Sequence, residues 1–285
     1  MNFAVVAVRA VYFIAALQLF GWLNYALFFA APARRRVIWW LAAVTLATLA
    51  VWLALEAGAM SGESIAAALS DGTLGTVLWD TRFGIFSLAR AALLLGVAIL
   101  VGWRGRPARI AATVAAAGTL ALSAATGHAG ADGSTTHLIA DMIHLLAAGA
   151  WLGGLVPFSL AMARSRAVAQ TGAEARRFST LGIVCVGAIL VTGGINGWFL
   201  VGNFPALIGT PYGRLLLVKL ALFVTMVPIA AFNRYRLTPS IRAGDRAALP
   251  ALRRNALIEV ALGFAILMII AMLGTLPPAY DAAAG

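Results

Sequence analysis

Charged residues and cysteine are both scarce in this chain, and their scarcity limits the class of protein that it can be. Only 11% of its 285 residues are charged and 62% are hydrophobic, whereas an ordinary soluble domain is about 45–50% apolar and about 25% charged. Disorder is excluded by this hydrophobicity. A disulfide scaffold is excluded because there is one cysteine, and collagen because no short-period repeat is present. A polytopic helical membrane protein remains.

Acidic residues are also few, with 10 Asp and Glu against 21 Lys and Arg, so the net charge is +11. In a soluble chain such an excess would indicate binding to nucleic acid. Here the basic residues fall in short clusters between apolar runs, which is typical of the cytoplasmic loops of membrane proteins. We therefore expect membrane lipid around the chain and no nucleic-acid partner.

Eight segments are long and apolar enough to cross a bilayer, which takes about 20 mostly apolar residues. The first lacks a preceding basic region and is too long for a signal peptide, so we expect it in the mature protein. The sequence thus predicts an all-α polytopic integral membrane protein, with a single transmembrane domain over residues 1–285. The predicted spans are Phe3–Ala30, Val37–Ala57, Phe83–Val101, Ile110–Thr126, Leu138–Ala161, Phe178–Val201, Tyr212–Phe232 and Asn255–Leu276.

The loops predict the orientation, because positively charged loops stay in the cytoplasm. Each loop after an odd-numbered span carries an arginine cluster, whereas the alternate loops carry acidic residues and almost no Lys or Arg. Both termini are therefore predicted to be periplasmic. The clusters are Arg34–Arg36, Arg104–Arg109, Arg164, Arg166, Arg176, Arg177, and the arginines from Arg234 to Arg254; the acidic residues are Glu63, Asp71, Asp80 and Asp132.

A shift of 129 residues superposes several unusual positions and predicts an internal repeat with halves 1–127 and 128–285. Each half contains four predicted spans, so the halves share one orientation and form a parallel 4+4 repeat about an axis normal to the membrane. The alternative is chance matching of apolar segments. The superposed positions are Thr81–Gly84 on Thr210–Gly213, Arg90 on Lys219, and Trp22 on Trp151.

All three histidines of the chain fall between residues 128 and 144. This stretch forms the outer end of the fourth span, a glycine-rich loop and the outer half of the fifth span. On a helix, His137 and His144 lie two turns apart, about 10 Å along the axis, with Asp141 between them. Asp141 is therefore placed to act as a ligand or to orient an imidazole, and His128 is placed to fold back across the loop.

Imidazoles that cluster with a carboxylate at a water-accessible membrane face are the parts of a transition-metal site. A proton relay or pH sensor, haem ligation, and hydrogen bonds that only pack helices are the alternatives. Met60, at the outer end of the second span, adds a thioether, which prefers Cu(I). The candidate metal ligands are His128, His137, Asp141, His144 and Met60.

Other polar groups in the spans have simpler interpretations. We expect Glu56 to pair with Arg90, Glu259 to occupy an interfacial position near the inner end of the last span, and Cys185 to pack as a small hydrophobe. Phosphate-binding loops, nucleophile elbows and carboxylate pairs suited to hydrolysis are absent from the sequence. We therefore expect that the protein is not an enzyme.

At these residues the chain resembles the copper resistance protein D (CopD) family of bacterial inner-membrane proteins. The resemblance implies a multi-pass inner-membrane protein that takes up copper from the periplasm, as Cu(I) or Cu(II), alongside a separate periplasmic copper-binding protein. It rests on Gly127-His128-Ala129, His137-x3-Asp141-x2-His144-x6-Trp151-x-Gly153-Gly154-Leu155, Met60-Ser61-Gly62, Thr210-x-x-Gly213-x5-Lys219, and the ending Leu273-Gly274-Thr275-Leu276-Pro277-Pro278.

Three functions follow from these residues. The first is a copper permease that works without ATP, since no ATP-binding motif is present. The second is a haem-bearing electron-transfer protein, with His128 and His144 as candidate axial ligands. The third is a scaffold that passes copper to another protein without transporting it.

Overall fold

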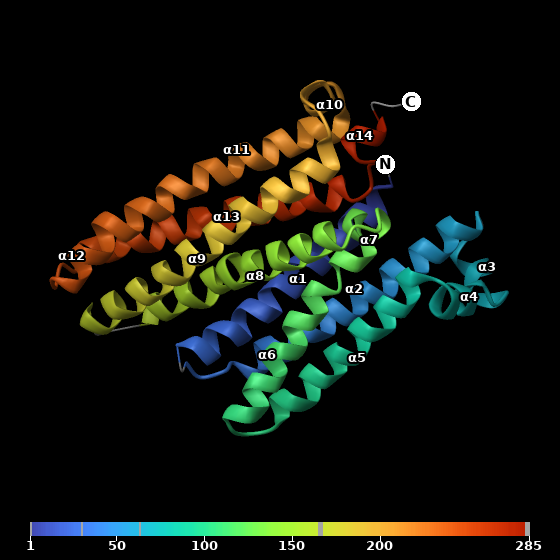
Figure 1. The fold of residues 1–285 in the computed structure, drawn as a ribbon. Helices are drawn as coiled ribbons and strands as arrows, with labels where there is room; N and C mark the ends of the chain where they lie inside the picture. Colours follow the sequence, from blue (N-terminus) through green and yellow to red (C-terminus); the bar gives the residue numbers. More distant parts are fainter. Residues whose placement is uncertain (1, 30, 63, 165–167, 283–285) are drawn as a thin grey trace.

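The computed structural model describes residues 2–29, 31–62, 64–164 and 168–282. These residues are almost entirely helical, and eight of their helices are long and apolar enough to cross a membrane (Figure 1). The all-α class and the eight predicted spans are therefore confirmed. Glu63 and Arg166, which contributed to the predicted loop charges, lie outside the described residues.

Long helices make up the body of the molecule, and short helices join them at the ends (Figure 1). The long helices are α1 (Phe3–Phe28), α2 (Arg35–Ser61), α5 (Arg82–Gly102), α6 (Arg106–Ala121), α8 (Thr135–Arg164), α9 (Val168–Val201), α11 (Pro211–Phe232) and α13 (Ala248–Leu273). The short helices are α3 (Ile65–Ser70), α4 (Thr73–Asp80), η1 (Ala124–Thr126), α7 (His128–Ala131), α10 (Phe204–Gly209), η2 (Asn233–Leu237), α12 (Thr238–Arg242) and α14 (Ala279–Ala282).

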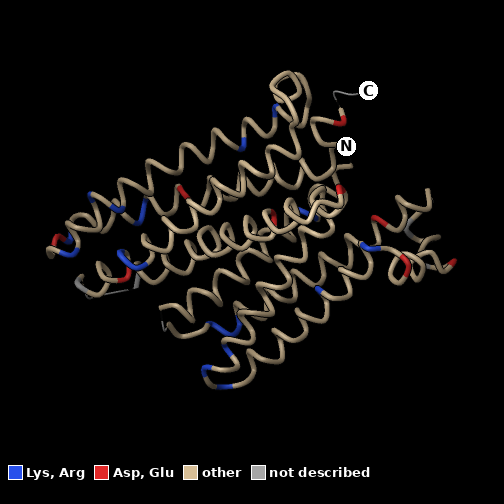
Figure 2. Tube along the Cα trace, in the orientation of Figure 1, with Lys and Arg blue, Asp and Glu red and all other residues tan. Residues whose placement is uncertain are grey.

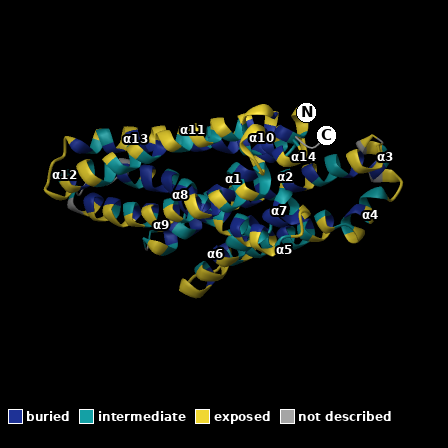
Figure 3. Ribbon diagram, turned by 45° about the horizontal axis from the view of Figure 1, so that its top comes forward, coloured by how far each residue is buried: buried dark blue, intermediate teal, exposed yellow. Residues whose placement is uncertain are grey.

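Helices α1 and α8 form the centre of the molecule. They are the two most buried of the long helices, and they pack along one another (Figure 3). They cross where Gly21 meets Gly153, and a Cβ on either glycine would overlap the backbone of the opposite helix. Small residues at such crossings let two membrane helices approach closely, where dispersion contacts hold them together.

The long helices form two groups of four, with α1, α2, α5 and α6 in the first and α8, α9, α11 and α13 in the second. In the first group, neighbouring helices pack on each other all the way round. In the second group, α8 packs on α9 and α13, and α13 packs on α11, but α9 contacts α11 only sparsely. The second group is therefore open between α9 and α11.

The predicted repeat pairs two helix starts that share one local structure. Thr81 accepts a hydrogen bond from the backbone N–H of Gly84 at 3.0 Å, and Thr210 accepts one from Gly213 at the same distance. Each hydroxyl also donates to the carbonyl four residues earlier. Both glycines press against the preceding short helix, where a Cβ would overlap backbone atoms. The motif is thus a helix cap at both places, and the equivalence of the whole halves remains a prediction.

Lysine and arginine gather mainly in the loops at one end of the helices, here called the basic end (Figure 2). Both chain termini lie at the opposite end, together with α7 and α10 (Figure 1). We call this the histidine end, because α7 and the first half of α8 carry all three histidines. The positive-inside pattern predicts that the basic end faces the cytoplasm and the histidine end the periplasm.

A buried arginine in the first group is satisfied without the expected acidic partner. Arg90 is fully buried and donates to the hydroxyls of Ser87 at 2.9 Å and Tyr12 at 3.4 Å. Glu56 accepts instead from the indole N–H of Trp52 at 2.9 Å. The expected pairing of Arg90 with Glu56 is therefore wrong, because Arg90 finds oxygen acceptors on its own helix and on α1.

The expectation for Glu259 is also wrong. Its side chain is only 3% exposed, and it lies near the middle of α13 rather than at the interface with water. Cys185 is buried within the main hydrophobic core, as expected.

Candidate metal site at the histidine end

His137 lies in the first turn of α8 and is held by a carboxylate from the loop before it. Ser134 precedes the helix, and its hydroxyl accepts from the backbone N–H of His137 at 3.3 Å. The Asp132 carboxylate accepts from the backbone N–H of Ser134 at 2.8 Å and pairs with Nδ1 of His137 through its other oxygen. The ring is 1% exposed and stacks on Phe199, with centroids 4.9 Å apart.

This arrangement leaves the second nitrogen of His137 as a lone-pair donor. A carboxylate accepts hydrogen bonds, so Nδ1 of His137 carries the proton and Nε2 is the nitrogen available to a metal ion. Histidine ligands commonly donate their other N–H to a carboxylate in this way. Asp141 was the carboxylate expected in that role, and Asp132 was not predicted, although the Asp-x-Ser-x-x-His spacing before a helix start indicates it.

His144 lies two turns further along α8 and is oriented from α9. Its Nδ1 lies 3.0 Å from the hydroxyl of Thr192. That hydroxyl gives its own proton to the carbonyl of Ala188 at 2.6 Å, so it accepts from the His144 N–H. In the neutral imidazole, Nε2 is then the unprotonated nitrogen. Gly193 lies beside the ring, where a Cβ would come within 3.5 Å of it.

Asp141 lies between these histidines along α8 and also pairs with α9. Its carboxylate accepts from the side-chain amide of Asn196 at 3.0 Å. It also lies near Lys219 of α11, whose side chain is half-buried. Asp141 on α8 therefore bonds to Asn196 of α9 and lies near the lysine of α11 that the repeat motif had singled out.

His128 begins α7 and folds back toward the same end. Its Nε2 lies 3.4 Å from the backbone carbonyl of Leu273, and its ring meets that of Tyr212 edge-on at 5.8 Å. Because a carbonyl only accepts, Nε2 carries the proton and Nδ1 is the lone-pair nitrogen. Burial lowers the pKa of His128 below its usual value, and the nearby Arg9 lowers it further. His128 is therefore neutral at pH 7.

Taken together, the candidates gather at one end of the second group without closing a compact cage. His128, His137 and Asp141 interact electrostatically with one another. Within the described part of the chain, however, no three side chains of His, Cys, Asp or Glu converge closely enough to enclose one metal ion. His137, Asp141 and His144 follow one another along α8, and we call them the polar strip. The strip offers separate imidazole nitrogens rather than a preformed site, and the ligand set stays a prediction.

Met60 lies apart from this strip. It is near the end of α2, which packs on α1, α3, α4 and α5, and its side chain is 58% exposed. An exposed thioether at this place offers a soft ligand at the surface of the histidine end. Its role as a copper ligand also stays a prediction.

Comparison with known proteins identifies the family. The family model described as copper resistance protein D matches residues 172–273, and that described as copper resistance protein D-like, N-terminal domain, matches residues 1–138. The chain is 33% identical to the copper resistance protein D of Pseudomonas syringae pv. tomato over 220 residues, which are 71% of each chain. This chain belongs to the copper resistance protein D family.

Two further relatives are similar to this chain over most of its length. The chain is 30% identical over 295 residues to the inner membrane protein YebZ of Escherichia coli (strain K12), which covers 98% of this chain and 99% of that protein. It is 31% identical over 248 residues to the copper transport protein CutJ of Bacillus subtilis (strain 168), covering 83% of this chain and 44% of CutJ. No solved structure matches the chain. The CopD resemblance drawn from the motifs is confirmed.

Proposed function

We propose that this protein carries copper across the bacterial inner membrane, from the histidine end to the basic end, without ATP and without catalysing a chemical reaction. Membership of the copper resistance protein D family supports a role in copper handling. A relative named as a copper transport protein supports transport as that role. The eight apolar helices and the relative named as an inner membrane protein place the chain in that membrane as a multi-pass protein.

The observation that carries the binding step is the pair of anchored imidazoles on α8. His137 and His144 each donate one N–H to a fixed oxygen, which turns the other nitrogen toward a possible metal ion. Imidazole nitrogen binds both oxidation states of copper well enough to capture the ion. Sites spaced along a strip, each with few ligands, hold an ion weakly enough to pass it on.

The second group of helices is the proposed route. Asp141 and His144 lie on α8 and Lys219 lies on α11, so all three belong to the second group. The first group instead holds the buried, positively charged Arg90 with its hydroxyl partners, and this charge disfavours the passage of a cation. The driving force is then the membrane potential, an ion gradient or trapping of copper in the cytoplasm.

Copper uptake by proteoliposomes tests the proposal. We expect His144→Ala to lower the initial uptake rate about tenfold or more, because loss of one ligand weakens a weak site strongly. Ser159→Ala is the matched control, since Ser159 lies on the same helix and donates to the carbonyl of Leu155, one turn earlier on that helix. Equal uptake by His144→Ala and wild type at equal protein content would contradict the proposal.

The same preparations separate the two alternatives. A scaffold that passes copper to another protein would bind copper but move none into the liposomes. A haem protein would show a Soret band in the absorption spectrum, whereas we expect the purified protein to be colourless. Addition of a periplasmic copper-binding protein to the outer solution should raise the uptake rate if it delivers the ion at the histidine end.

A further inference from the structure

A cavity of about 370 Å³ lies inside the second group of helices, toward the basic end. Its walls come from α8, α9, α11, η2, α12 and α13, so it fills the space where α9 and α11 fail to pack on each other. Most of the lining is apolar or aromatic, including Trp151, Phe158 and Phe178. Tyr235 also lines it and is 68% exposed, so the cavity reaches the protein surface at that end.

One carboxylate faces this apolar space. Glu259 lines the cavity, and its Oε1 accepts from the side-chain amide of Asn233 at 3.0 Å. Asn255 donates to the carbonyl oxygen of the same amide at 2.8 Å, which fixes the amide so that its NH₂ points at Glu259. A carboxylate within a membrane span is costly to bury, and such residues mark ion pathways and proton relays.

The backbone that presents Asn233 is also unusual. Asn233 begins the π-helical segment η2, which follows α11 directly, and the hydroxyl of Thr238 donates to its carbonyl at 2.8 Å. Single π-turns are rare and occur often at functional sites. The next residue, Arg234, reaches across to α9 and donates to the hydroxyl of Ser179 at 3.1 Å. The widened turn thus sets an amide inside the cavity and an arginine at its rim.

The side chains that line the cavity indicate which cation it can bind. Besides Glu259 and Asn233, the polar side chains that face the cavity are Ser179 of α9, Arg234 and Tyr235 of η2, Thr238 of α12, and the indole of Trp151 on α8. Among the residues that the structure describes, the lining contains no histidine, cysteine or methionine, so it offers none of the soft ligands that copper prefers. A single carboxylate in an apolar space binds a proton far more readily than a metal ion.

We propose that Glu259 is a proton-binding carboxylate that opens to the basic end through this cavity, and that its protonation is coupled to the passage of copper through the same helices. The proton enters from water at the mouth, binds a carboxylate oxygen and leaves by the same route or toward the histidine end. Proton binding stands on the cavity and its hydrogen bonds, whereas the coupling rests on the proposed copper transport.

Helix α8 connects the two sites. His144 is the residue of the polar strip nearest the basic end. Trp151, which lines the cavity, follows it by seven residues, which is about 10 Å along the same face of α8. Trp151 packs against Gly182 of α9. If copper binding at His144 shifts α8 against α9, the same shift therefore changes the shape of the cavity.

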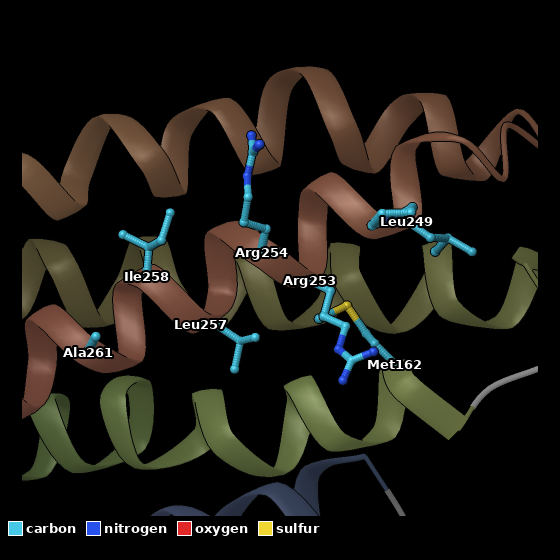
Figure 4. Close-up of a pocket in the computed structure, with 8 residues that line it drawn as sticks. Met162, Leu249, Arg253, Arg254, Leu257, Ile258 and Ala261 are labelled. Atoms are coloured by element: carbon cyan, nitrogen blue, oxygen red, sulfur yellow. The ribbon is translucent and has the colours of Figure 1, made fainter.

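The larger hollow beside α13 has a different chemistry. It measures about 650 Å³ and is lined by Met162, Leu249, Pro250, Arg253, Arg254, Leu257, Ile258 and Ala261. Figure 4 shows Arg253 pointing toward Met162 and Arg254 pointing the opposite way. The described residues of its lining include two arginines and no carboxylate, so it repels a cation rather than binding one.

Infrared difference spectroscopy on the purified, copper-free protein tests proton binding directly. We expect a protonated-carboxyl band that titrates with pH and shifts in D₂O, that is lost in Glu259→Gln, and that persists in Glu56→Gln. Glu56 is the matched control, because it too accepts from one nitrogen donor but lies outside the cavity. A titrating band that is unchanged in Glu259→Gln, or no such band in wild type, would overturn the proton site.

A second variant tests the proton site independently if Glu259→Gln does not fold. Asn233→Leu keeps the carboxylate but removes its only described amide donor. Because that donor favours the charged form, its loss should move the midpoint of the band to higher pH. An unchanged midpoint in Asn233→Leu would contradict the assignment.

Copper uptake under an imposed pH gradient tests the coupling. We expect the wild-type rate to change several-fold with the gradient, and the rate of Glu259→Gln to be independent of it. Wild-type uptake that ignores the gradient would overturn the coupling and leave copper transport standing. If wild type moves no copper, the proposed function fails together with the coupling, while the infrared band still decides the proton site.

Discussion

At the scale of single residues, each histidine ring has an oxygen partner at one of its nitrogens. Asp132 holds His137, Thr192 holds His144, and the carbonyl of Leu273 holds His128. These contacts decide which nitrogen carries the proton in each neutral ring. They therefore also decide from which direction a copper ion approaches.

The first prediction concerns the carboxylate that orients His137. Asp132→Asn should weaken copper binding about 10–100-fold, because the amide no longer fixes the ring or raises its basicity. Competition against a chromophoric copper chelator measures the change. Asp80→Asn, in the short helix α4, is the control and should leave the affinity unchanged. If both variants bind as wild type does, Asp132 plays no part in the site.

The second prediction follows from the pKa of His128, which burial lowers. The folded protein then binds this proton less readily than the unfolded chain, so the free energy of unfolding rises with pH in this range. Copper-free protein should lose stability as the pH falls below about 6.5, the usual pKa of histidine.

Thermal unfolding in detergent with a chelator present measures this effect. His128→Gln should show a weaker dependence of the melting temperature on pH than wild type. A melting temperature that rises on acidification in wild type, with the rise lost in His128→Gln, would contradict the sign.

The sequence places the histidines correctly at one end of the bundle but does not reveal their partners. Their clustering and the helical spacing of His137 and His144 are local properties, so they are readable from the sequence. Thr192 and Asn196 lie about 50 residues away on α9, and only the packing of α8 on α9 brings them into contact. Glu259 was misread for the same reason, because Asn233 belongs to another helix.

At the scale of helices, close approach of α1 and α8 holds the two groups together. The Gly149-x-x-x-Gly153 spacing is typical of close helix packing, and Gly153 packs closely against Gly21. Which helix provides the partner is decided by the order of spans in three dimensions. No local pattern carries that information.

The third prediction tests this crossing. Gly153→Ala should destabilise the protein by about 1–3 kcal/mol, because the new methyl group overlaps the backbone of α1. Gly96→Ala is the control, since nothing lies within 4 Å of a Cβ there. Equilibrium or thermal unfolding in detergent compares the two. Equal stability of both variants would show that the crossing tolerates a larger side chain.

At the scale of the whole molecule, the two groups of four helices differ in how completely their neighbouring helices pack on one another. The first group is sealed around Arg90 and Tyr12, whereas the second is open between α9 and α11 and contains the polar strip and the cavity. The sequence repeat predicted two similar halves. The proposed copper route lies within the second half, and it depends on packing that the sequence does not display.

The fourth prediction concerns the orientation of the molecule. In a Cys185→Ser background, a membrane-impermeant thiol reagent applied to intact cells with a permeable outer membrane should label Asp281→Cys but not Arg104→Cys. These positions lie at the histidine end and the basic end respectively. The opposite labelling pattern would reverse the assigned direction of copper movement.

Copper-edge X-ray absorption on purified protein loaded with one equivalent of copper tests the central claim most directly, namely that the histidine end binds copper through imidazole. We predict scattering from imidazole nitrogen in wild type, reduced in His137→Gln and in His144→Gln and lost when all three histidines are replaced. A spectrum that is the same in wild type and in the triple variant would contradict the account.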